Sequence, residues 1–590
     1  MERRIFLAVL LMSAVLIVNN LLFPPVPEPD GAGAPRADSA EVRKTAAPPP
    51  PAAAAPRPVR PPPTAPAAGP GDSVVVVTPL ARYVLSTRGG AVLRVELPRY
   101  PSYTEPGEPV QLVPEDVTDL LATRVESPTG SVEFASALFR VDRSRLTVRE
   151  GEAPQTLRLV HDDGAGSSME LLYIFDPTRY GIDVRGSVSG VARGSRLVTS
   201  LGTGLAAHEA SDHHPERELA VVAWETDAAR VETERLAALE GVDTLTGPLG
   251  WVGIKDKYFF AALVADSGAD FSRATARHLS PSSLRHAGEE EAVPLPRAQL
   301  RAELPLGADG TFAYRAYLGP LEHARLVAAG RNLQDVNPYG YRWLNWLVRP
   351  IAAAVLWILA RMHDNLGIAY GWVLIIFGVM MRVVLWPLNA KAMRAQMRNM
   401  ETQPLLQERM KAVQEKYTDD RQRQQQEMMA VYKELGVNPF SMLSGCLPML
   451  IPMPVLITLF FVFQSAIEFR GASFLWLQDL SLRDPYYILP VFMVGSMFAL
   501  QWVTTQMSGM AQNPQMKIMM YAMPLMMGIF FWNLASGLNL YYATTNLASI
   551  PQQLLIARER REAQARLKAE QEEEAKGPKR PPPRRKRKRA

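Results

Sequence analysis

The feature that most constrains this 590-residue chain is a series of five apolar stretches between residues 371 and 556. Each comes close to the roughly 20 apolar residues that an α-helix needs to cross a bilayer. Because lipid offers no hydrogen bonds to the main chain, such stretches are stable in a membrane as helices. The sequence therefore predicts a polytopic α-helical membrane protein. The five predicted transmembrane helices are residues 371–388, 447–467, 487–503, 517–533 and 538–556.

A further apolar stretch, residues 5–23, follows Arg3 and Arg4. It is longer than the roughly 7 to 15 apolar residues typical of a cleaved secretory signal. We interpret residues 1–23 as another transmembrane helix with its N-terminus in the cytoplasm, which brings the predicted total to six. A cleaved signal is the alternative, because the small residues at 31–34 could serve a signal peptidase.

The region between the first and second predicted helices changes character twice. Residues 24–71 are rich in proline and alanine with almost no large apolar residues, which predicts an extended tether. Residues 72–342 contain short β-branched runs, such as SVVVVTP and MELLYIFDP, separated by Gly, Pro and Asp. Their period-two alternation is typical of half-buried strands. This segment predicts a large antiparallel β-sandwich with its own core.

The β-rich segment carries no recognisable catalytic motif, since it contains neither a GxxxxGK[ST] phosphate loop nor an HExxH sequence. Cys446 is the single cysteine, which excludes an intrachain disulfide framework and a cysteine-based metal site. His208, Asp212, His213 and His214 could bind a metal, but in so polar a run we expect solvated histidines. The sequence thus predicts no metal, no cofactor and no enzymatic activity.

Loop charges predict the orientation of the membrane part. Residues 389–439 contain nine Lys and Arg, whereas residues 468–486 contain two. By the positive-inside rule the first of these loops lies in the cytoplasm. Six helices then leave both termini in the cytoplasm of an inner-membrane protein, with the β-rich segment in a periplasm-like compartment.

Two segments flanking the second predicted helix have helical patterns of their own. Residues 343–363 are apolar but interrupted by two arginines and a proline, which predicts an interfacial amphipathic helix. Residues 389–440 show two runs of helical spacing separated by a polar break, which predicts a cytoplasmic helical hairpin. A docking surface on this hairpin would be an addition to the same structure.

Arg382 lies inside a predicted transmembrane helix. An arginine there costs at least about 2.5 to 3.5 kcal/mol on insertion scales and stays charged. Its head group could snorkel to the cytoplasmic interface, which is the structural alternative. However, the five later helices contain no Asp or Glu. We therefore expect Arg382 to face a hydrated cavity or to meet a transient anionic ligand.

The last apolar stretch carries a polar stripe. Asn539, Tyr542, Asn546, Ser549 and Gln553 recur at three- and four-residue spacing, which places them on one face of a helix. Because polar side chains facing lipid are costly, we expect this face to line a hydrated cavity. Interhelical hydrogen bonding is the alternative.

The C-terminal tail, residues 557–590, ends in a polycation: nine of the last fifteen residues are Lys or Arg, and none is acidic. Such a segment binds phosphate-rich partners, either ribosomal RNA or anionic membrane lipids. Charge alone does not separate the two. The candidate binding residues are Arg584, Arg585, Lys586, Arg587, Lys588 and Arg589.

Several segments of the membrane part stand in a specific order: MRVVLWPLNAKAMRAQMRNM, QQQEMMAVYKELGVNPFSMLSGCLPMLIPMPVL, DLSLRDPYYILPV, NPQMKIMMYAMPLMM and SGLNLYYATTNLASIPQQLLI. Together they resemble the YidC-type membrane protein insertases of Gram-negative bacteria. GWVGIKDKYFFAAL at 250–263 similarly resembles the end region of that family's periplasmic domain. The resemblance covers essentially the whole chain outside the Pro-rich tether.

This resemblance implies a five-helix insertase core with a hydrophilic groove, a cytoplasmic hairpin and a periplasmic β-supersandwich. It implies that hydrophobic segments of nascent membrane proteins pass from the cytoplasm into the inner membrane, alone or with the Sec translocon, without nucleotide hydrolysis. The groove arginine corresponds to Arg382, and the LYY motif of a substrate-contacting helix corresponds to Tyr541 and Tyr542. Asn539 and Asn546 of the polar stripe complete the candidate groove residues.

In one respect the chain departs from the family pattern. A threonine that some relatives have one turn before the arginine is Gly378 here, which puts a polar substrate contact at that position in doubt. Basic tails occur in some members, where they resemble ribosome-binding extensions.

Two alternatives come from other classes of protein. An envelope enzyme would need an active-site constellation in its carbohydrate-binding-like β-domain, and the sequence shows none. A solute transporter would be expected to carry an acidic relay and inverted repeats, which are also missing.

Overall fold

The computed structural model describes residues 73–576, apart from 165, 212–213, 267, 286–290, 338–344, 388, 391–408, 411, 414, 418–419, 435–452 and 509–513. The predicted first transmembrane helix, the tether and the six tail cations lie outside the described residues. Much of the predicted hairpin, Cys446 and the start of the predicted helix 447–467 also lie outside them.

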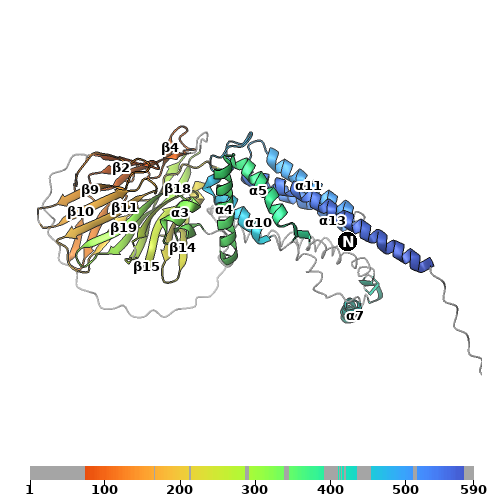
Figure 1. Cartoon of the computed structure of the whole chain (residues 1–590). Helices are drawn as coiled ribbons and strands as arrows, with labels where there is room; N and C mark the ends of the chain where they lie inside the picture. Colours follow the sequence, from red (N-terminus) through yellow and green to blue (C-terminus); the bar gives the residue numbers. More distant parts are fainter. Residues whose placement is uncertain are drawn as a thin grey trace, which may run out of the picture. The chain divides into compact units, whose positions relative to one another are not determined.

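Residues 73–337 form a domain of two β-sheets, here called the β-domain (Figure 1). The smaller sheet has five strands in the order β4-β3-β2-β1-β8. These are β1 Ser73–Val77, β2 Arg82–Ser86, β3 Val92–Pro101, β4 Pro109–Gln111 and β8 Arg145–Thr147.

The larger sheet has fourteen strands. Twelve follow the order β6-β5-β12-β18-β17-β15-β16-β19-β11-β10-β9-β7, while β13 pairs with β14 and β15. Their bounds are β5 Thr123–Ser127, β6 Gly130–Glu133, β7 Arg140–Val141, β9 Gln155–Asp162, β10 Ser168–Phe175, β11 Ile182–Ser189, β12 Arg196–Ser200, β13 Ala220–Glu225, β14 Arg230–Arg235, β15 Val242–Lys255, β16 Phe259–Ala265, β17 Phe271–Leu284, β18 Val293–Pro305 and β19 Thr311–Pro320.

The β10 strand shows why alternating sequence produces these sheets. Met169, Leu171, Tyr173 and Phe175 point to the buried face, and the residues between them are partly exposed. Because successive side chains of a strand point to opposite faces, this pattern buries one face on the core. The strand pairs antiparallel with both β9 and β11, so the predicted β-sandwich is confirmed here.

One pair of strands departs from the antiparallel prediction. The three-residue strand β8 pairs with β1 in parallel, with Val76 opposite Leu146. A parallel pair needs a long crossover connection, and the chain between these strands builds β2 to β7 first. The local alternation of each strand carries no information about such a distant partner.

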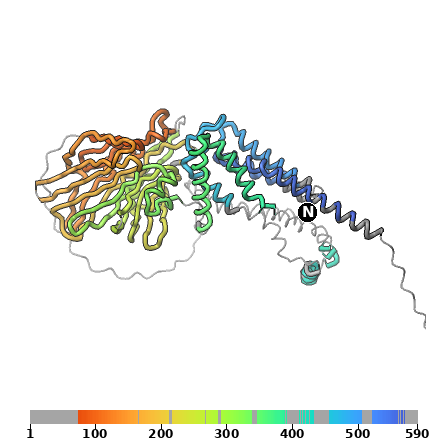
Figure 2. The backbone as a smooth tube through the Cα atoms, in the orientation of Figure 1, coloured from red at the N-terminus to blue at the C-terminus, as the bar shows by residue number. Residues whose placement is uncertain are grey.

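The strands of the β-domain run close beside one another (Figure 2), and the buried apolar side chains of the domain belong to one hydrophobic core. All seven residues of β16 are buried, as expected for a strand covered on both faces. Trp251 and Phe260 are among the largest fully buried side chains and meet edge to face, with ring centroids 5.7 Å apart. Aromatic groups of this size dominate the energetics of a core.

The helical part follows the β-domain along the chain (Figure 1). Short helices α2 Pro215–Glu218, η2 Leu236–Ala238, α3 His323–Ala329 and η3 Leu333–Val336 belong to the β-domain. The later helices are α4 Asn345–Leu366, α5 Tyr370–Val384, α7 Arg421–Glu434, α10 Met453–Ser465, η5 Ile467–Phe469, α11 Ile488–Ser508, α12 Pro514–Phe531 and α13 Ser536–Lys576.

The described helices differ in whether they are long and apolar enough to cross a bilayer. Within the described residues, one helix segment, Trp346–Leu366, is both long and apolar enough to cross a bilayer. It lies in the region predicted as an interfacial helix. Shorter apolar segments occupy α5, α10, α11 and α12, while α13 continues to Lys576, beyond the predicted helix 538–556.

A second hydrophobic core joins the apolar helices. Helix α13 packs against α5, α10 and α11, and α4 packs against α10. Phe377 of α5, Phe463 of α10 and Tyr541 of α13 are buried in this core. The C-terminal helix therefore lies at the centre of the helical contacts.

Candidate functional site

Arg382 lies in the last turn of α5. Its side chain is half-buried, and its Nε donates a hydrogen bond to the main-chain oxygen of Thr545 on α13, at 3.2 Å. None of the five predicted transmembrane helices supplies a carboxylate. A guanidinium has five N–H donors and is always charged. Within the part of the chain that the structure describes, the contact with Thr545 therefore leaves donors of Arg382 available to water or to an anionic ligand.

Gly378 lies one helical turn before Arg382 and marks the close approach of α5 to α13. A Cβ atom at this position would lie 3.3 Å from the Cγ2 atoms of both Thr544 and Thr545. Absence of a side chain lets the two backbones come together. This gives a packing reason for the departure from the family pattern at Gly378, which also means that no polar side chain is available there.

Tyr541 and Tyr542 connect α13 to three other helices. The buried ring of Tyr541 lies 6.0 Å from Phe377 of α5 and 5.4 Å from Phe463 of α10, measured between centroids. Tyr542 meets Phe531 of α12 edge to face, at 4.9 Å. Their aromatic bodies therefore help to hold the helices together, and their predicted contact with substrate stays a prediction.

The two candidate asparagines make hydrogen bonds within the helical core. Asn546 donates from Nδ2 to the hydroxyl of Ser496 on α11, at 3.0 Å. Asn539 is fully buried and donates to the main-chain oxygen of Phe531, at 3.2 Å. Interhelical hydrogen bonding, the alternative considered from sequence, thus describes both asparagines in this structure, since Phe531 belongs to α12. Substrate contact at these two positions stays a prediction.

Sequence reasoning missed two contacts that hold α13 beside the end of α5. Gln552 donates from Nε2 to the main-chain oxygen of Trp386, at 3.1 Å. The other contact is the main-chain oxygen of Thr545, which accepts from Arg382 of α5 and, within α13, from the hydroxyl of Ser549. Backbone carbonyls leave no sequence signature, so no pattern could have indicated the Thr545 contact.

His208, in the histidine-rich run of the β-domain, has a structural role. Contrary to the expectation of solvated histidines, His208 is buried; its Nδ1 lies 2.9 Å from the hydroxyl of Ser102, and its Nε2 contacts the main chain of Gln111. Burial lowers its pKa. Asp212 and His213 lie outside the described residues, among which no group of three potential metal ligands occurs.

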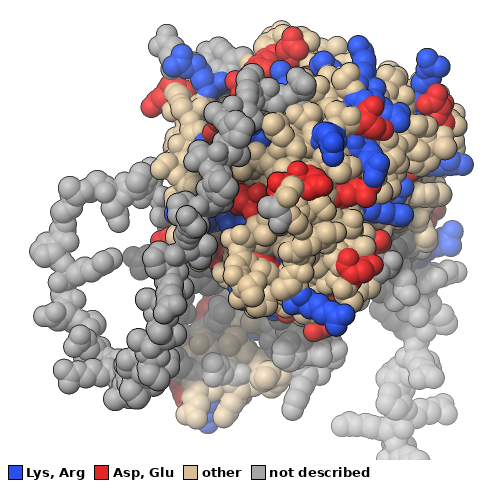
Figure 3. All heavy atoms as spheres, turned by 90° about the vertical axis from the view of Figure 1, so that its left-hand side faces the viewer, with Lys and Arg blue, Asp and Glu red and all other residues tan. Residues whose placement is uncertain are grey.

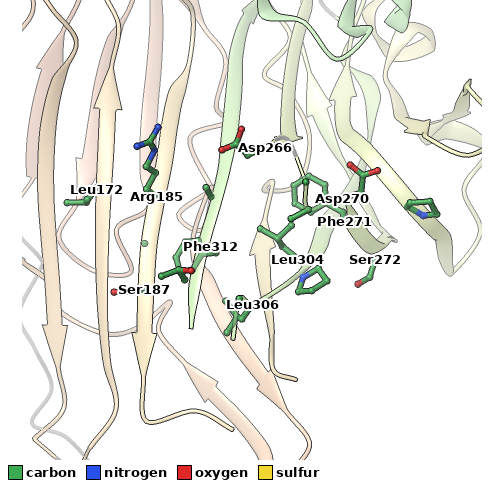
Figure 4. Close-up of a pocket in the computed structure, with 18 of the residues that line it drawn as sticks. Leu172, Arg185, Ser187, Asp266, Asp270, Phe271, Ser272, Leu304, Leu306 and Phe312 are labelled. Atoms are coloured by element: carbon green, nitrogen blue, oxygen red, sulfur yellow. The ribbon is translucent and has the colours of Figure 1, made fainter. Parts of the chain in front are cut away.

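A cavity of about 1110 Å³ lies on the β-domain, walled mainly by β11, β17, β18 and β19 (Figure 4). Leu304, Leu306 and Phe312 lie toward its middle. Asp270, on its rim, forms an ion pair with Arg331. This carboxylate therefore has a structural partner within the β-domain.

The face of the molecule in Figure 3 carries basic and acidic side chains interspersed with one another. The β-domain has exposed ion pairs, such as Arg158 with Glu170 and Arg230 with Glu232. Interspersed charges of both signs produce no strong field of one sign. This surface therefore provides no electrostatic indication of a highly charged partner.

Two family models match the chain in succession. The YidC periplasmic domain matches residues 73–354, and the 60Kd inner membrane protein matches residues 361–564. A membrane protein insertase YidC of Syntrophus aciditrophicus is 30% identical over 576 residues, covering 94% of this chain and 99% of the relative. One of Cupriavidus necator is also 30% identical, covering 94% of this chain and 97% of the relative.

A solved structure described as an active YidC insertase with its first transmembrane domain resolved is also similar. It shares 16% sequence identity with a TM-score of 0.30, covering 82% of this chain and 94% of the other. One family model matches the β-sandwich domain, and the other matches the apolar helical part that follows it. This combination defines the class of inner-membrane insertases. The chain belongs to the YidC family of membrane protein insertases.

Proposed function

We propose that this insertase receives hydrophobic segments of nascent membrane proteins along the faces of α5 and α13 around Arg382. The proposal rests on the surroundings of the Arg382 guanidinium. This group lies in an apolar helix, and it binds a carbonyl oxygen rather than a carboxylate. An incoming acidic or polar group would be a better partner than a neutral carbonyl, because charge-assisted hydrogen bonds are stronger.

The physical basis of insertion is partitioning. A hydrated groove beside Arg382 would let the polar end of a client enter part of the bilayer without full desolvation. Its apolar segment would then move laterally into lipid, driven by about 25 cal/mol for each Å² of apolar surface removed from water. No covalent step and no nucleotide are needed, so the protein acts as an insertase and chaperone rather than an enzyme.

The proposed topology has six transmembrane helices, with residues 1–23 as the first and both termini in the cytoplasm. The excess of Lys and Arg in residues 389–439 supports a cytoplasmic hairpin at 389–440. The β-domain then faces the periplasm. Helix α4 is proposed to lie at the periplasmic interface, since it carries Arg349 and Arg361 and exposes Trp346 and Trp357.

The proposed partners are nascent membrane proteins, the Sec translocon, membrane lipids and the ribosome. The ribosome proposal rests on the basic tail, Arg584 to Arg589. Counterion release makes such binding steeply dependent on salt. Truncation after Ala575 should weaken ribosome co-sedimentation, and added salt should weaken the full-length protein more than the truncation. Equal salt slopes for the two proteins would contradict this.

Crosslinking to a stalled ribosome–nascent chain tests the proposed site. A photoreactive amino acid at Asn546 should crosslink to the apolar segment of the client. The matched control is Ile529 on α12, which is 79% exposed. Equal crosslinking yields from both positions would show that the client lies near the helices without occupying a specific site. That result would contradict the proposal.

A further inference from the structure

A buried ion pair joins the β-domain to the loop that follows α10. The side chains of Arg470 and Glu209 are 0% and 1% exposed. Nε of Arg470 lies 2.9 and 3.1 Å from the two carboxylate oxygens of Glu209. The partners are 261 residues apart in sequence. We call residues 467–484, which contain Arg470, the junction loop.

Aromatic rings of the β-domain enclose the rest of the Arg470 guanidinium. Its Cζ lies 4.6 Å from the ring centroid of Tyr103 and 5.4 Å from that of Phe259. Among the described residues, Nη1 has no hydrogen-bond partner, and these ring faces supply cation–π contacts near it. The hydroxyl of Tyr103 donates to Asp479, a second contact between the β-domain and the junction loop.

The short helix η5, at the start of the junction loop, takes part in both hydrophobic cores. Ile467 belongs to the core of the β-domain. Phe469, two residues later, belongs to the core of the helical part, where its ring meets Tyr370 of α5 and Phe463 of α10. Arg470 directly follows, so the ion pair lies where the two cores come together.

The far end of the junction loop holds the beginning of α13. The main-chain N–H of Ser536 donates to the oxygen of Leu482 at 2.7 Å, and that of Gly537 donates to the oxygen of Leu480 at 2.9 Å. The hydroxyl of Ser536 donates to the oxygen of Asp479 at 3.2 Å. The first N–H groups of a helix lack partners within it, and here the junction loop provides them.

We propose that Arg470 is a positioning residue for insertion. Its ion pair with Glu209 holds the junction loop on the β-domain, and the loop in turn fixes the start of α13. Tyr541, Tyr542 and Asn546 follow within the next three turns of that helix. The β-domain therefore acts on the client-facing helix through the junction loop, with this buried pair as the central contact, and does not itself contact the client. This inference rests on the proposed role of α13 in receiving clients.

Removing one partner of a buried pair has a different effect from removing both. A single substitution leaves a buried charge uncompensated, whereas replacing both partners by apolar residues of similar size is often neutral. Arg470→Ala should therefore release the junction loop. The double variant Glu209→Leu with Arg470→Met should keep it docked, since both hydrophobic contacts of η5 remain.

The test uses full-length protein in lipid nanodiscs. Hydrogen–deuterium exchange is measured in residues 467–484 and 536–545, and the insertion rate of a single-span client is measured on the same samples. Arg470→Ala should increase exchange in both segments and slow insertion severalfold. Glu209→Leu with Arg470→Met should restore both toward wild type. Arg483→Ala, an exposed arginine of the same loop, is the matched control and should change neither.

Two results would overturn the inference. One is faster exchange in residues 467–484 with unchanged exchange in residues 536–545, because the loop would then not position α13. The other is faster exchange in both segments with a wild-type insertion rate. Crosslinking of the client to Asn546 in the wild-type protein reports separately on the proposed function. Loss of that crosslink would contradict the client site, whereas its persistence alongside either result would contradict the positioning role alone.

Discussion

Two arginines show how differently the β-domain junction and the helical core treat a charge. Arg470 is completely buried, bound to a carboxylate and enclosed by two aromatic rings. Arg382 is half-buried and, among the described residues, bound to one carbonyl oxygen. A charge with a fixed partner stabilises one arrangement of the chain. A charge without a fixed counter-charge is available to a ligand, and this distinguishes a structural arginine from a candidate binding arginine.

The largest expected effect comes from breaking the fixed pair. Glu209→Ala leaves the guanidinium of Arg470 buried without its carboxylate, and such a loss costs about 3 to 5 kcal/mol of unfolding free energy. Thermal unfolding of the purified full-length protein would measure it. Glu232→Ala removes a partner from the exposed pair with Arg230 and should cost far less, because water screens an exposed pair. Equal losses would erase the distinction between buried and exposed pairs.

The second prediction concerns Asp256, beside the same junction. Burial, with a further contribution from the charge of Glu209, raises its pKa from 3.8 to about 7. The folded state thus holds this proton more tightly than the unfolded state, so the contribution to stability falls as pH rises from about 4 to about 7. Asp256→Asn keeps an acceptor for the N–H groups of Tyr258 and Phe259 and should remove that fall.

Chemical unfolding would be measured at pH 4.5 and pH 7.5, which roughly span the interval over which Asp256 titrates. The effect is the difference between the variant and the wild type in how the free energy of unfolding changes with pH. Asp309→Asn is the matched control. Hydrogen bonds from Thr311 lower the pKa of Asp309 from 3.8, so its contribution to stability is lost only below about pH 4, and this variant should leave the difference between pH 4.5 and pH 7.5 unchanged. If Asp256→Asn left the pH dependence unchanged, Asp256 would not be held protonated by its surroundings.

The third prediction tests the available charge. Arg382→Ala should impair insertion of clients with acidic translocated segments by roughly tenfold, because a hydrogen bond to a charged group is worth about 1.5 to 3 kcal/mol. Arg382→Lys should be milder, since the charge is kept while the planar fork is lost. Protease protection of matched acidic and neutral clients would measure both. If the alanine variant, at equal expression, inserted both clients as well as the wild type does, the result would contradict a binding role and would favour snorkelling of the Arg382 head group.

The smallest expected effect concerns the helix contact beside Arg382. Gly378→Ala places a methyl group 3.3 Å from two threonine methyl groups on α13, whereas a Cβ at Gly495 of α11 would meet nothing within 4 Å. Alanine at Gly495 should stabilise the helix by up to about 1 kcal/mol. Alanine at Gly378 should offset that gain by crowding, which typically costs about 1 to 3 kcal/mol. Equal unfolding temperatures for the two variants would argue against a tight contact.

Local patterns in the sequence predicted much of this fold. The alternation of β10 and the apolar runs of α5 and α11 identify their elements, because each depends on residues a few positions apart. The parallel pairing of β1 with β8 could not be predicted in this way. It depends on two segments about 70 residues apart, whose partnership is decided by the assembled sheet.

The candidate site was predictable to a similar degree. Arg382 stands out because its charge conflicts with its apolar surroundings. Glu209 gave no such signal, since it lies in a polar run where an exposed carboxylate is the ordinary expectation. Its burial becomes evident only when Arg470, from a loop 261 residues away, is placed beside it.

The three-residue helix η5 also limits how this protein can be recombined with its relatives. One residue separates Ile467, which completes the β-domain core, from Phe469, which completes the helical core. A chimera that exchanges the β-domain at its sequence boundaries would leave the donor domain without its Ile467 counterpart and without a matched arginine. Transplanting residues 467–470 together with the β-domain would keep both cores filled, so the natural modular unit of this protein is discontinuous in sequence.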